Sequence, residues 1–460
     1  MRILPFSGVA LGLLLPFLAQ AGDGAPLVPS TRTDLKQALE NSKHNVPRLP
    51  LPPMTEEEKV LASQPVDLSK GKFGVVNNGR MRKFYLPTGA VTGGLSRDPD
   101  PAMSLGYPFQ TRLFWIVSRG NNCTYCMGHQ EAKLAAVGMS DDEIAALDGD
   151  WSEAGSQERA AYEFTRKLTA APHQITDADL ADLRTAGYTN AQILEMVLVD
   201  SNFNAMNRWT GALRIPQEEH REYLTPTTDK FAALASRIAP ATETGEARIA
   251  APVQRPQPDA ETVSAALKAS RVRSPRLPLV DDAQARQILG AAAPASGPLP
   301  QWMRLLATFP KAGPGRVAMY QAAQQNGELP PRFKAIVAYV AARNDRAWYA
   351  LDVASNRLKA LGFSDPEIAA LVAQSAPLSA EERKLLKATQ AGGTPAVPAE
   401  RVVASFARKL TTDPARIEDF DVEGLRLYFS DKATAEVIHH VAESAFFDRL
   451  TETSGLTLEP

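Results

Sequence analysis

The sequence predicts an all-α protein, and three observations lead to that prediction. From about residue 106 onward, apolar residues recur at helical spacing between residues that favour helix caps. No convincing run of alternating apolar and polar residues indicates a β-strand. Two stretches of the chain repeat each other, which indicates two tandem copies of one helical unit.

Length and composition limit the class of protein. The 460 residues suggest two or three domains, and an apolar content of 44% supports buried cores. The formal net charge is −2, with both signs mixed along the chain, so no electrostatic footprint for nucleic acid is present. No later stretch approaches the 18 or so apolar residues of a membrane span. We therefore expect neither nucleic acid nor membrane as a partner.

The N-terminal residues 1–21 have the pattern of a secretory signal peptide. Arg2 supplies a positive charge, residues 9–18 are mostly apolar, and residues 19–21 read Ala-Gln-Ala, a small-x-small cleavage site. An uncleaved N-terminal anchor is the alternative. The pattern predicts a periplasmic or secreted protein.

Proline-rich stretches divide the chain into segments. We interpret residues 22–66 as an extended proline-rich arm and residues 226–297 as a linker, with a short helix at about 261–269. The linker is interpreted as a spacer without a function of its own. The two helical units are then expected at residues 67–225 and 298–450.

The first unit can be divided into helices from its sequence. Helices are expected at residues 112–119, from about 123 to 138, and at 157–168, 177–184 and 191–213. Asn121 or Asn122 is expected to cap the helix that begins near residue 123. Capping boxes are expected at 140–143 and 189–192, where Ser or Thr is followed three residues later by Glu or Gln.

An internal repeat relates the two units. Residues 119–147 align with 343–371 without a gap, and 12 of the 29 positions are identical, against about two expected by chance. Farther on, the run at 166–169 recurs at 408–411. The offset grows from 224 to 242, so the second copy has gained 18 residues, and the glycine-rich residues 392–395 are the expected site of this insertion.

Only the first copy contains cysteine. The repeat aligns Cys123, Cys126 and His129 with Ala347, Ala350 and Val353, respectively. A tyrosine is kept at the equivalent positions 125 and 349. Because the scaffold exists in the second copy without cysteines, a chemical role for them is favoured over a purely structural one.

The spacing of Cys123 and Cys126 at a predicted helix start suits a redox pair. Free amide groups and the positive end of the helix dipole stabilise a thiolate, which is the reactive form. Residues three apart share one helix face, so the two sulfurs can form a local disulfide. Such a small ring stabilises a fold little, which favours a redox couple. His129, three residues beyond Cys126, can exchange a proton with it.

Other interpretations of the cysteine pair remain. A haem attachment site is excluded because Met127, not histidine, follows the second cysteine. A structural disulfide and a zinc site are alternatives, although zinc would need further ligands from distant parts of the sequence. We expect no metal and no cofactor.

Several other polar residues receive a weaker interpretation. His173 and His220 are interpreted as surface residues. We interpret Asp200, Asn202 and Asn207 as candidates to border a pocket beside the cysteines. The equally weighted alternative is that these side chains form hydrogen bonds at a helix end.

The residues from Phe114 to His129 resemble the core signature of the carboxymuconolactone decarboxylase family. More narrowly, they resemble its alkylhydroperoxidase D-like (AhpD-like) branch, in which Cys-x-Tyr-Cys is followed shortly by His. Residues 203–209 resemble the helix that closes over the site in that branch. The resemblance covers roughly residues 67–225, and a degenerate copy covers about 298–450.

The resemblance implies two all-helical domains and thiol-dependent peroxidase activity. It assigns Cys126 as the cysteine that attacks a hydroperoxide, Cys123 as the resolving cysteine and His129 as part of the proton relay. A thiol reductant, which the sequence does not identify, would reopen the disulfide. Because family members usually oligomerise, we expect an intramolecular pseudo-dimer or a homo-oligomer.

The chain departs from the branch pattern at two positions. Thr111 stands where the branch often has a glutamate at the head of its relay, and Gln130 stands where its histidine commonly lies. These two departures affect the expected proton relay and not the cysteine pair. The sequence therefore predicts a redox-active dithiol more strongly than it predicts peroxidase activity. Two other functions remain as alternatives: a lactone decarboxylase or isomerase, as elsewhere in the family, and a non-catalytic assembly protein.

Overall fold

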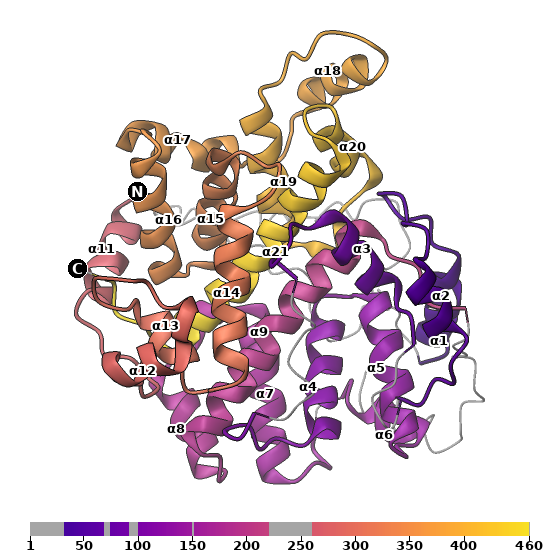
Figure 1. Ribbon diagram of the computed structural model, residues 1–460, viewed down its shortest axis with the longest axis vertical. Coiled ribbons are helices and arrows are strands. Elements are labelled where there is room, and N and C mark those ends of the chain that lie inside the picture. The colour runs from indigo at the N-terminus through magenta and orange to yellow at the C-terminus, as the bar shows by residue number, and fades with distance from the viewer. Residues whose placement is uncertain (1–31, 69–73, 92–99, 150, 220–259, 460) are drawn as a thin grey trace, which may run out of the picture.

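The structure is a computed structural model in which the described residues form an all-helical protein (Figure 1). The described ranges are 32–68, 74–91, 100–149, 151–219 and 260–459. No β-strand occurs within these ranges. The prediction of an all-α class is confirmed. Residues 1–21, expected to be a signal peptide, lie outside the described residues, as does His220.

The first copy forms the indigo-to-magenta half of the molecule (Figure 1). Its helices are α1 (Arg32–Asn41), α2 (Glu56–Ala62), α3 (Asn77–Tyr85), α4 (Tyr107–Gly120), α5 (Thr124–Ala136), α6 (Asp141–Ala146), α7 (Ser156–Ala170), α8 (Asp177–Thr185) and α9 (Asn190–Leu213). The capping boxes predicted at 140–143 and 189–192 are confirmed at the starts of α6 and α9. Each satisfies two amide groups that a helix start would otherwise leave free.

The cap of α5 differs from the prediction. Cys123, rather than Asn121 or Asn122, occupies the cap position, and its sulfur accepts a hydrogen bond from the backbone N–H of Cys126. Asn122 instead adopts a left-handed backbone conformation with φ of 50°, which asparagine tolerates better than most residues. The turn thereby places the first sulfur at the helix start itself.

The second copy forms the orange-to-yellow half (Figure 1). Its helices are α11 (Ala260–Ser270), α12 (Asp282–Leu289), α13 (Gln301–Leu306), α14 (Ala312–Gln325), α15 (Pro331–Asp345), α16 (Trp348–Ala360), α17 (Asp365–Gln374), α18 (Ala380–Gln390), α19 (Ala399–Thr412), α20 (Asp419–Arg426) and α21 (Asp431–Thr453). Helices α15, α16 and α17 repeat α4, α5 and α6, and helices α19, α20 and α21 repeat α7, α8 and α9. The inserted residues form α18, so the insertion begins before the expected residues 392–395.

The repeat extends beyond the sequence match. Glu195 of α9 accepts hydrogen bonds from the backbone N–H groups of Ser104 and Leu105. At the equivalent place in the second copy, Glu436 accepts from the N–H groups of Glu328 and Leu329. A buried carboxylate therefore fixes the same loop in both copies, although the sequence around these loops did not reveal the relationship.

Two predicted segments are wrong in the residues that the structure describes. The expected arm at 22–66 contains α1, which packs against α5 through the buried Leu35 and Leu39. In the expected linker at 226–297, the short helix expected at about 261–269 is confirmed as α11, whereas α12 and the buried Leu277 and Leu289 were not expected of a spacer. Each segment contains at least one short amphipathic helix between prolines. They are stabilised by packing on their own copy, which is a tertiary effect that local composition does not reveal.

The two copies pack together along the long helices α9 and α21, which lie at the centre of the molecule (Figure 1). Arg208 of α9 donates to the backbone oxygen of Thr411 at 2.9 Å, and Arg449 of α21 donates to that of Thr169, also at 2.9 Å. Because each copy makes the same contact to the other, the interface has the reciprocal character of a twofold dimer interface.

A second reciprocal pair of contacts lies at the edge of the interface. Arg48 of the first copy pairs with Asp419 of α20 at 2.8 Å, and Arg276 of the second copy pairs with Asp177 of α8 at 3.1 Å. The buried apolar side chains of both copies form one continuous cluster. In the described part of the chain, no helix is long and apolar enough to span a membrane.

Candidate active site

The two cysteines meet at the N-terminus of α5, close to a threonine of α9. The hydroxyl oxygen of Thr210 lies 3.1 Å from the sulfur of Cys123 and 3.1 Å from that of Cys126. Both thiols are free, and the two residues are only 3% and 2% exposed. The structure therefore brings the predicted pair together as a buried dithiol that shares one hydroxyl group.

The environment of the two thiols is unequal. Burial opposes ionisation of both, and it raises the pKa of Cys123, as do the hydrogen bond and charge of the neighbouring Cys126. At Cys126, hydrogen bonds from Cys123, Thr210 and Asn207 outweigh the effect of burial and hold its pKa below the usual value, with help from the charge of Lys133. The geometry thus distinguishes Cys126 as the thiol that ionises first.

A buried amide network supports the thiol pair from behind. The side-chain amide of Asn121 donates to the side-chain oxygens of Asn204 and Asn207, each at 3.0 Å. Asn207 in turn donates to the hydroxyl of Ser118 at 3.2 Å. Arg208 donates to the backbone oxygen of Asn204 as well as to the second copy. Asn207 is thereby fixed beside Cys126 by groups that also reach the interface between the copies.

His129 lies about one turn beyond Cys126 on α5 and contacts Glu218, in the segment that follows α9. Its Nε2 is 3.0 Å from a carboxylate oxygen of Glu218, and its ring lies 4.5 Å from that of Tyr125, centroid to centroid. Glu218 also accepts hydrogen bonds from the Tyr125 hydroxyl at 2.9 Å and from the backbone N–H of Asn77 at 3.0 Å. A carboxylate therefore orients the imidazole and fixes its ring.

The two positions that depart from the branch pattern are both buried. The hydroxyl of Thr111 donates to the backbone oxygen of Tyr107 on its own helix. Gln130 donates to the backbone oxygen of Cys126 at 3.2 Å and accepts from the ammonium group of Lys133 at 3.3 Å. The side-chain amide of Gln130 therefore connects the backbone of Cys126 with the ammonium group of Lys133.

Comparison with known proteins gives one family. The model of the carboxymuconolactone decarboxylase family matches residues 310–391, which contain α14 to α18 of the second copy. This segment of the second copy is therefore similar to the carboxymuconolactone decarboxylase family. No curated protein matches the chain at a significant level. The predicted resemblance to the family is therefore confirmed, whereas the AhpD-like branch stays a prediction.

The carboxymuconolactone decarboxylase match falls on the copy without cysteines. The first copy has α4 to α9 in the same order as α15 to α17 and α19 to α21, with α18 inserted in the second copy. Tyr125 binds Glu218, and the equivalent Tyr349 binds Glu459 at 2.5 Å. This order of helices therefore occurs twice, and only one occurrence carries the dithiol.

Sequence reasoning missed Thr210 and Asn121 as parts of this site, whereas Asn204 and Arg208 lie in the run 203–209 that was expected to close over it. One signal for Thr210 was available, because the Arg-x-Thr run at 208–210 recurs at 449–451. Among the weaker candidates, Asn207 lies at the site. Asp200 lies nearer the start of α9, where its carboxyl accepts from the Thr165 hydroxyl at 2.8 Å.

The structure gives no sign of a metal centre in the ranges it describes. In those ranges, no group of three or more His, Cys, Asp or Glu side chains is arranged to hold a metal ion. The chemistry available at the site is accordingly that of the two thiols, the Thr210 hydroxyl, the amide network and the His129–Glu218 pair.

Proposed function

We propose that the first copy is a dithiol peroxidase site that reduces hydroperoxides through Cys126 and Cys123. The observation that carries this proposal is the unequal pair of thiols at the start of α5, both 3.1 Å from one hydroxyl group. A thiol with a lowered pKa is the nucleophile of such reactions, and a neighbouring protonated thiol completes them. The family match supports the fold on which this chemistry rests.

The proposed reaction balances with the groups at the site. The Cys126 thiolate attacks the terminal oxygen of the hydroperoxide, the O–O bond breaks, and Cys126 becomes a sulfenic acid while the alkoxide takes a proton and leaves as alcohol. The Cys123 sulfur then displaces hydroxide from the sulfenic acid, which leaves as water and yields the Cys123–Cys126 disulfide. An external dithiol reduces that disulfide in the last step.

The neighbouring residues have distinct proposed roles. Thr210 and Asn207 stabilise the Cys126 thiolate by hydrogen bonding. His129, oriented by Glu218, supplies the proton that the leaving alkoxide needs. Lys133 adds a positive charge near the nucleophile.

The first experiment compares Cys126→Ser with Cys123→Ser in the mature chain. With dithiothreitol as reductant, the wild-type protein should consume tert-butyl hydroperoxide, and Cys126→Ser should lose this activity by several orders of magnitude because the nucleophile is gone. Cys123→Ser should still react once and accumulate a sulfenic acid on Cys126, which a dimedone adduct detected by mass spectrometry would locate. Undiminished turnover by Cys126→Ser would exclude the proposal.

Thiol dependence also separates the proposal from lactone decarboxylation or isomerisation. Those reactions need no cysteine pair, so a lactone-converting activity that survives alkylation of both thiols would favour this alternative. The control is Met127→Leu, which leaves both cysteines in place within the same helix turn.

We also propose that the second copy serves the first as a built-in second subunit. The reciprocal contacts of Arg208 and Arg449 support this, because isologous contacts are typical of dimers. Size-exclusion chromatography with light scattering should then give a monomeric full chain. Truncation after residue 225 should cause dimerisation or aggregation, and a stable monomeric fragment would contradict the proposal.

Export is a further part of the proposed function. Residues 19–21 supply the small-x-small pattern that supports cleavage after Ala21. Expression in a Gram-negative host should yield a periplasmic protein whose N-terminal residue is Gly22, as N-terminal sequencing can show. A cytosolic protein that retains Met1 would contradict export.

A further inference from the structure

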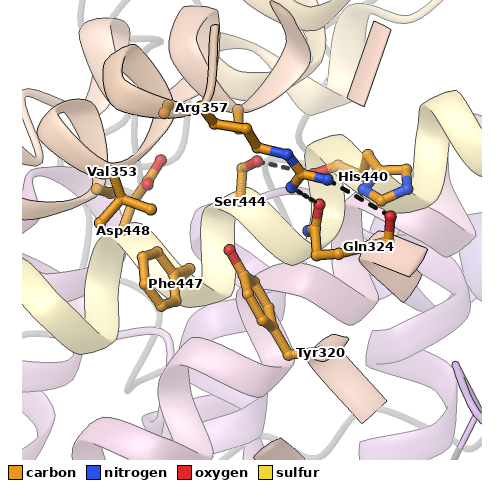
Figure 2. Close-up of a pocket in the computed structure, with 11 residues that line it drawn as sticks. Tyr320, Gln324, Val353, Arg357, His440, Ser444, Phe447 and Asp448 are labelled. Atoms are coloured by element: carbon orange, nitrogen blue, oxygen red, sulfur yellow. Dashed lines mark hydrogen bonds between the residues drawn. The ribbon is translucent and has the colours of Figure 1, made fainter. Parts of the chain in front are cut away.

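The second copy has a cavity at the position that the thiols occupy in the first copy. The cavity measures about 20 Å³ and lies between α14, α16 and α21 (Figure 2). Ala350 and Val353, which replace Cys126 and His129, both line it. Because these side chains are smaller or less polar than their counterparts, the site has lost its thiols and gained an opening.

The polar lining of this cavity is new rather than inherited. It is formed by Tyr320 and Gln324 of α14, Arg357 of α16, and His440, Ser444 and Asp448 of α21. Arg357 and Asp448 stand where the first copy has Lys133 and Asn207, and His440 stands where it has Val199. A degenerate site that only filled space would be expected to become apolar, yet this one contains four ionisable side chains.

Arg357 supplies a positive charge without a matching negative one. Its guanidinium donates to the side-chain and backbone oxygens of Gln324 (Figure 2). Within the described residues, no carboxylate forms an ion pair with it. A guanidinium whose hydrogen bonds go only to neutral groups retains its attraction for an anion.

Asp448 and Tyr320 add further donors. Asp448 is 1% exposed, and one of its carboxyl oxygens is buried without a hydrogen-bond partner among the described residues. Burial and the neighbouring Asp345 raise the pKa of Asp448 well above its usual value, which favours its protonated form. Burial raises the pKa of Tyr320 to about 12, and the described residues offer its hydroxyl no hydrogen-bond partner.

His440 completes the wall of the cavity as a neutral group. Burial, with the nearby charges of His439, Lys334 and Arg357, lowers the pKa of its imidazole well below the usual value, while the backbone of Ala323 accepts its N–H. The lining of the cavity therefore presents the Arg357 guanidinium and the O–H groups of Tyr320 and Asp448, and the nearby carboxylate of Glu443 is paired with Arg316 at 2.8 Å. Such a lining favours a small anion over a cation or an apolar ligand.

We propose that this cavity binds a small carboxylate anion of about the size of formate. Arg357 would hold the carboxylate, and the hydroxyl groups of Tyr320 and of the Asp448 carboxyl would complete its hydrogen bonds. A single water needs roughly 10–15 Å³ of such space, so a cavity of about 20 Å³ limits the ligand to little more than one carboxylate group and excludes larger acids. The site is independent of the thiols and extends beyond the function proposed for them.

Calorimetric titration of the full mature chain tests this proposal. Sodium formate should bind with one site per chain, sodium acetate and sodium benzoate should bind at least about tenfold more weakly, and sodium chloride at equal ionic strength should not compete. Absent binding of formate, or equally strong binding of chloride or benzoate, would overturn the proposal.

Variants locate the binding in the cavity. Arg357→Gln should weaken binding by at least about tenfold, because the charge that attracts the anion is removed. Tyr320→Phe preserves shape and removes no other hydrogen bond, so it keeps the test valid if Arg357→Gln fails to fold, and it should weaken binding by about three- to tenfold. Arg332→Gln, an exposed arginine of α15, is the matched charge control.

The thiols provide the last control. The double variant Cys123→Ala with Cys126→Ala should bind formate as the wild type does, because the two sites are separate. Binding that follows the cysteine substitutions, or that is unaffected by both Arg357→Gln and Tyr320→Phe, would place the anion elsewhere and refute the assignment.

Discussion

Helices α5 and α16 begin with nearly the same backbone geometry but with different chemistry. The cap residue Cys123 has φ −90° and ψ 96°, and its counterpart Ala347 has φ −91° and ψ 92°. The sulfur of Cys123 accepts a hydrogen bond from the helix, and a methyl group does not. The turn is therefore imposed by the packing of the family fold, and the thiol is added to a turn that exists without it.

The polar groups behind the two turns differ in charge. The first copy surrounds its thiols with the amides of Asn121 and Asn207, whereas the second has Asp345 and Asp448 at these positions. Asp345 forms a buried ion pair with Arg449 at 3.0 Å, both side chains being 1% exposed. Amides are neutral donors that stabilise a thiolate, whereas the ion-paired carboxylate of Asp345 would oppose the ionisation of a thiol beside it. The comparison teaches that the site depends on its amide network as well as on the cysteines.

The largest expected effect comes from transferring the cysteines between the copies. A chain with Cys123→Ala and Cys126→Ala should be inactive towards hydroperoxides. Adding Ala347→Cys and Ala350→Cys should leave the rate at least about 100-fold below wild type, because Asp448 and Val353 replace the thiolate donor and the proton donor. Measured peroxide consumption close to the wild-type rate would show that the cysteine spacing alone suffices.

The interface arginines should differ in their contribution to stability. Arg449→Met removes the partner of a buried carboxylate and should lower the free energy of unfolding by about 3–5 kcal/mol. Arg208→Met removes hydrogen bonds to the backbone oxygens of Asn204 and Thr411 and should lower it by about 1–3 kcal/mol. Urea denaturation measures both values. The reverse order would mean that the charge difference between the copies does not govern the interface.

Asp200 offers a pH test that the second copy lacks, because Val441 stands at the equivalent position. Burial raises the pKa of Asp200 to about 8. The folded chain therefore holds a proton that the unfolded chain releases, and stability falls as pH rises from about 4 to about 8. Asp200→Asn should remove this part of the loss and gain on the order of a few kcal/mol at the alkaline end. Asp182→Asn, an exposed carboxylate on α8, should change the thermal unfolding profile little.

Thr210 and Thr451 form the most closely matched pair of variants. Thr210→Val removes the hydroxyl that contacts both sulfurs and should raise the pKa of the Cys126 thiol by about one unit. The thiolate absorbance in the ultraviolet should then appear at higher pH. Thr451→Val makes the same change on α21, where no thiol is present, and should leave the titration unchanged. Equal shifts in both variants would indicate an indirect effect.

Much of the fold and the centre of the site could be predicted from sequence. The capping boxes at 140–143 and 189–192 were readable because they are local, and the repeat revealed the second copy because α5 and α6 are matched without a gap. The redox pair was readable because three-residue spacing on a helix fixes the relation of the two sulfurs. The helix α11 was predicted, whereas α1 and α12 were missed because prolines lie near them and packing stabilises them.

The sequence by itself determined that the protein is helical and duplicated, and that it has one cysteine pair at the start of a helix. Only the tertiary structure decided which groups surround that pair. Thr210 lies 84 residues beyond Cys126 in the chain, and Thr411 of the second copy reaches the same network through Arg208. Local patterns encode hydrogen bonds within a helix, whereas contacts between distant helices depend on how their faces pack. For this reason, the unequal thiols and the cavity at Arg357 became visible only in the folded chain.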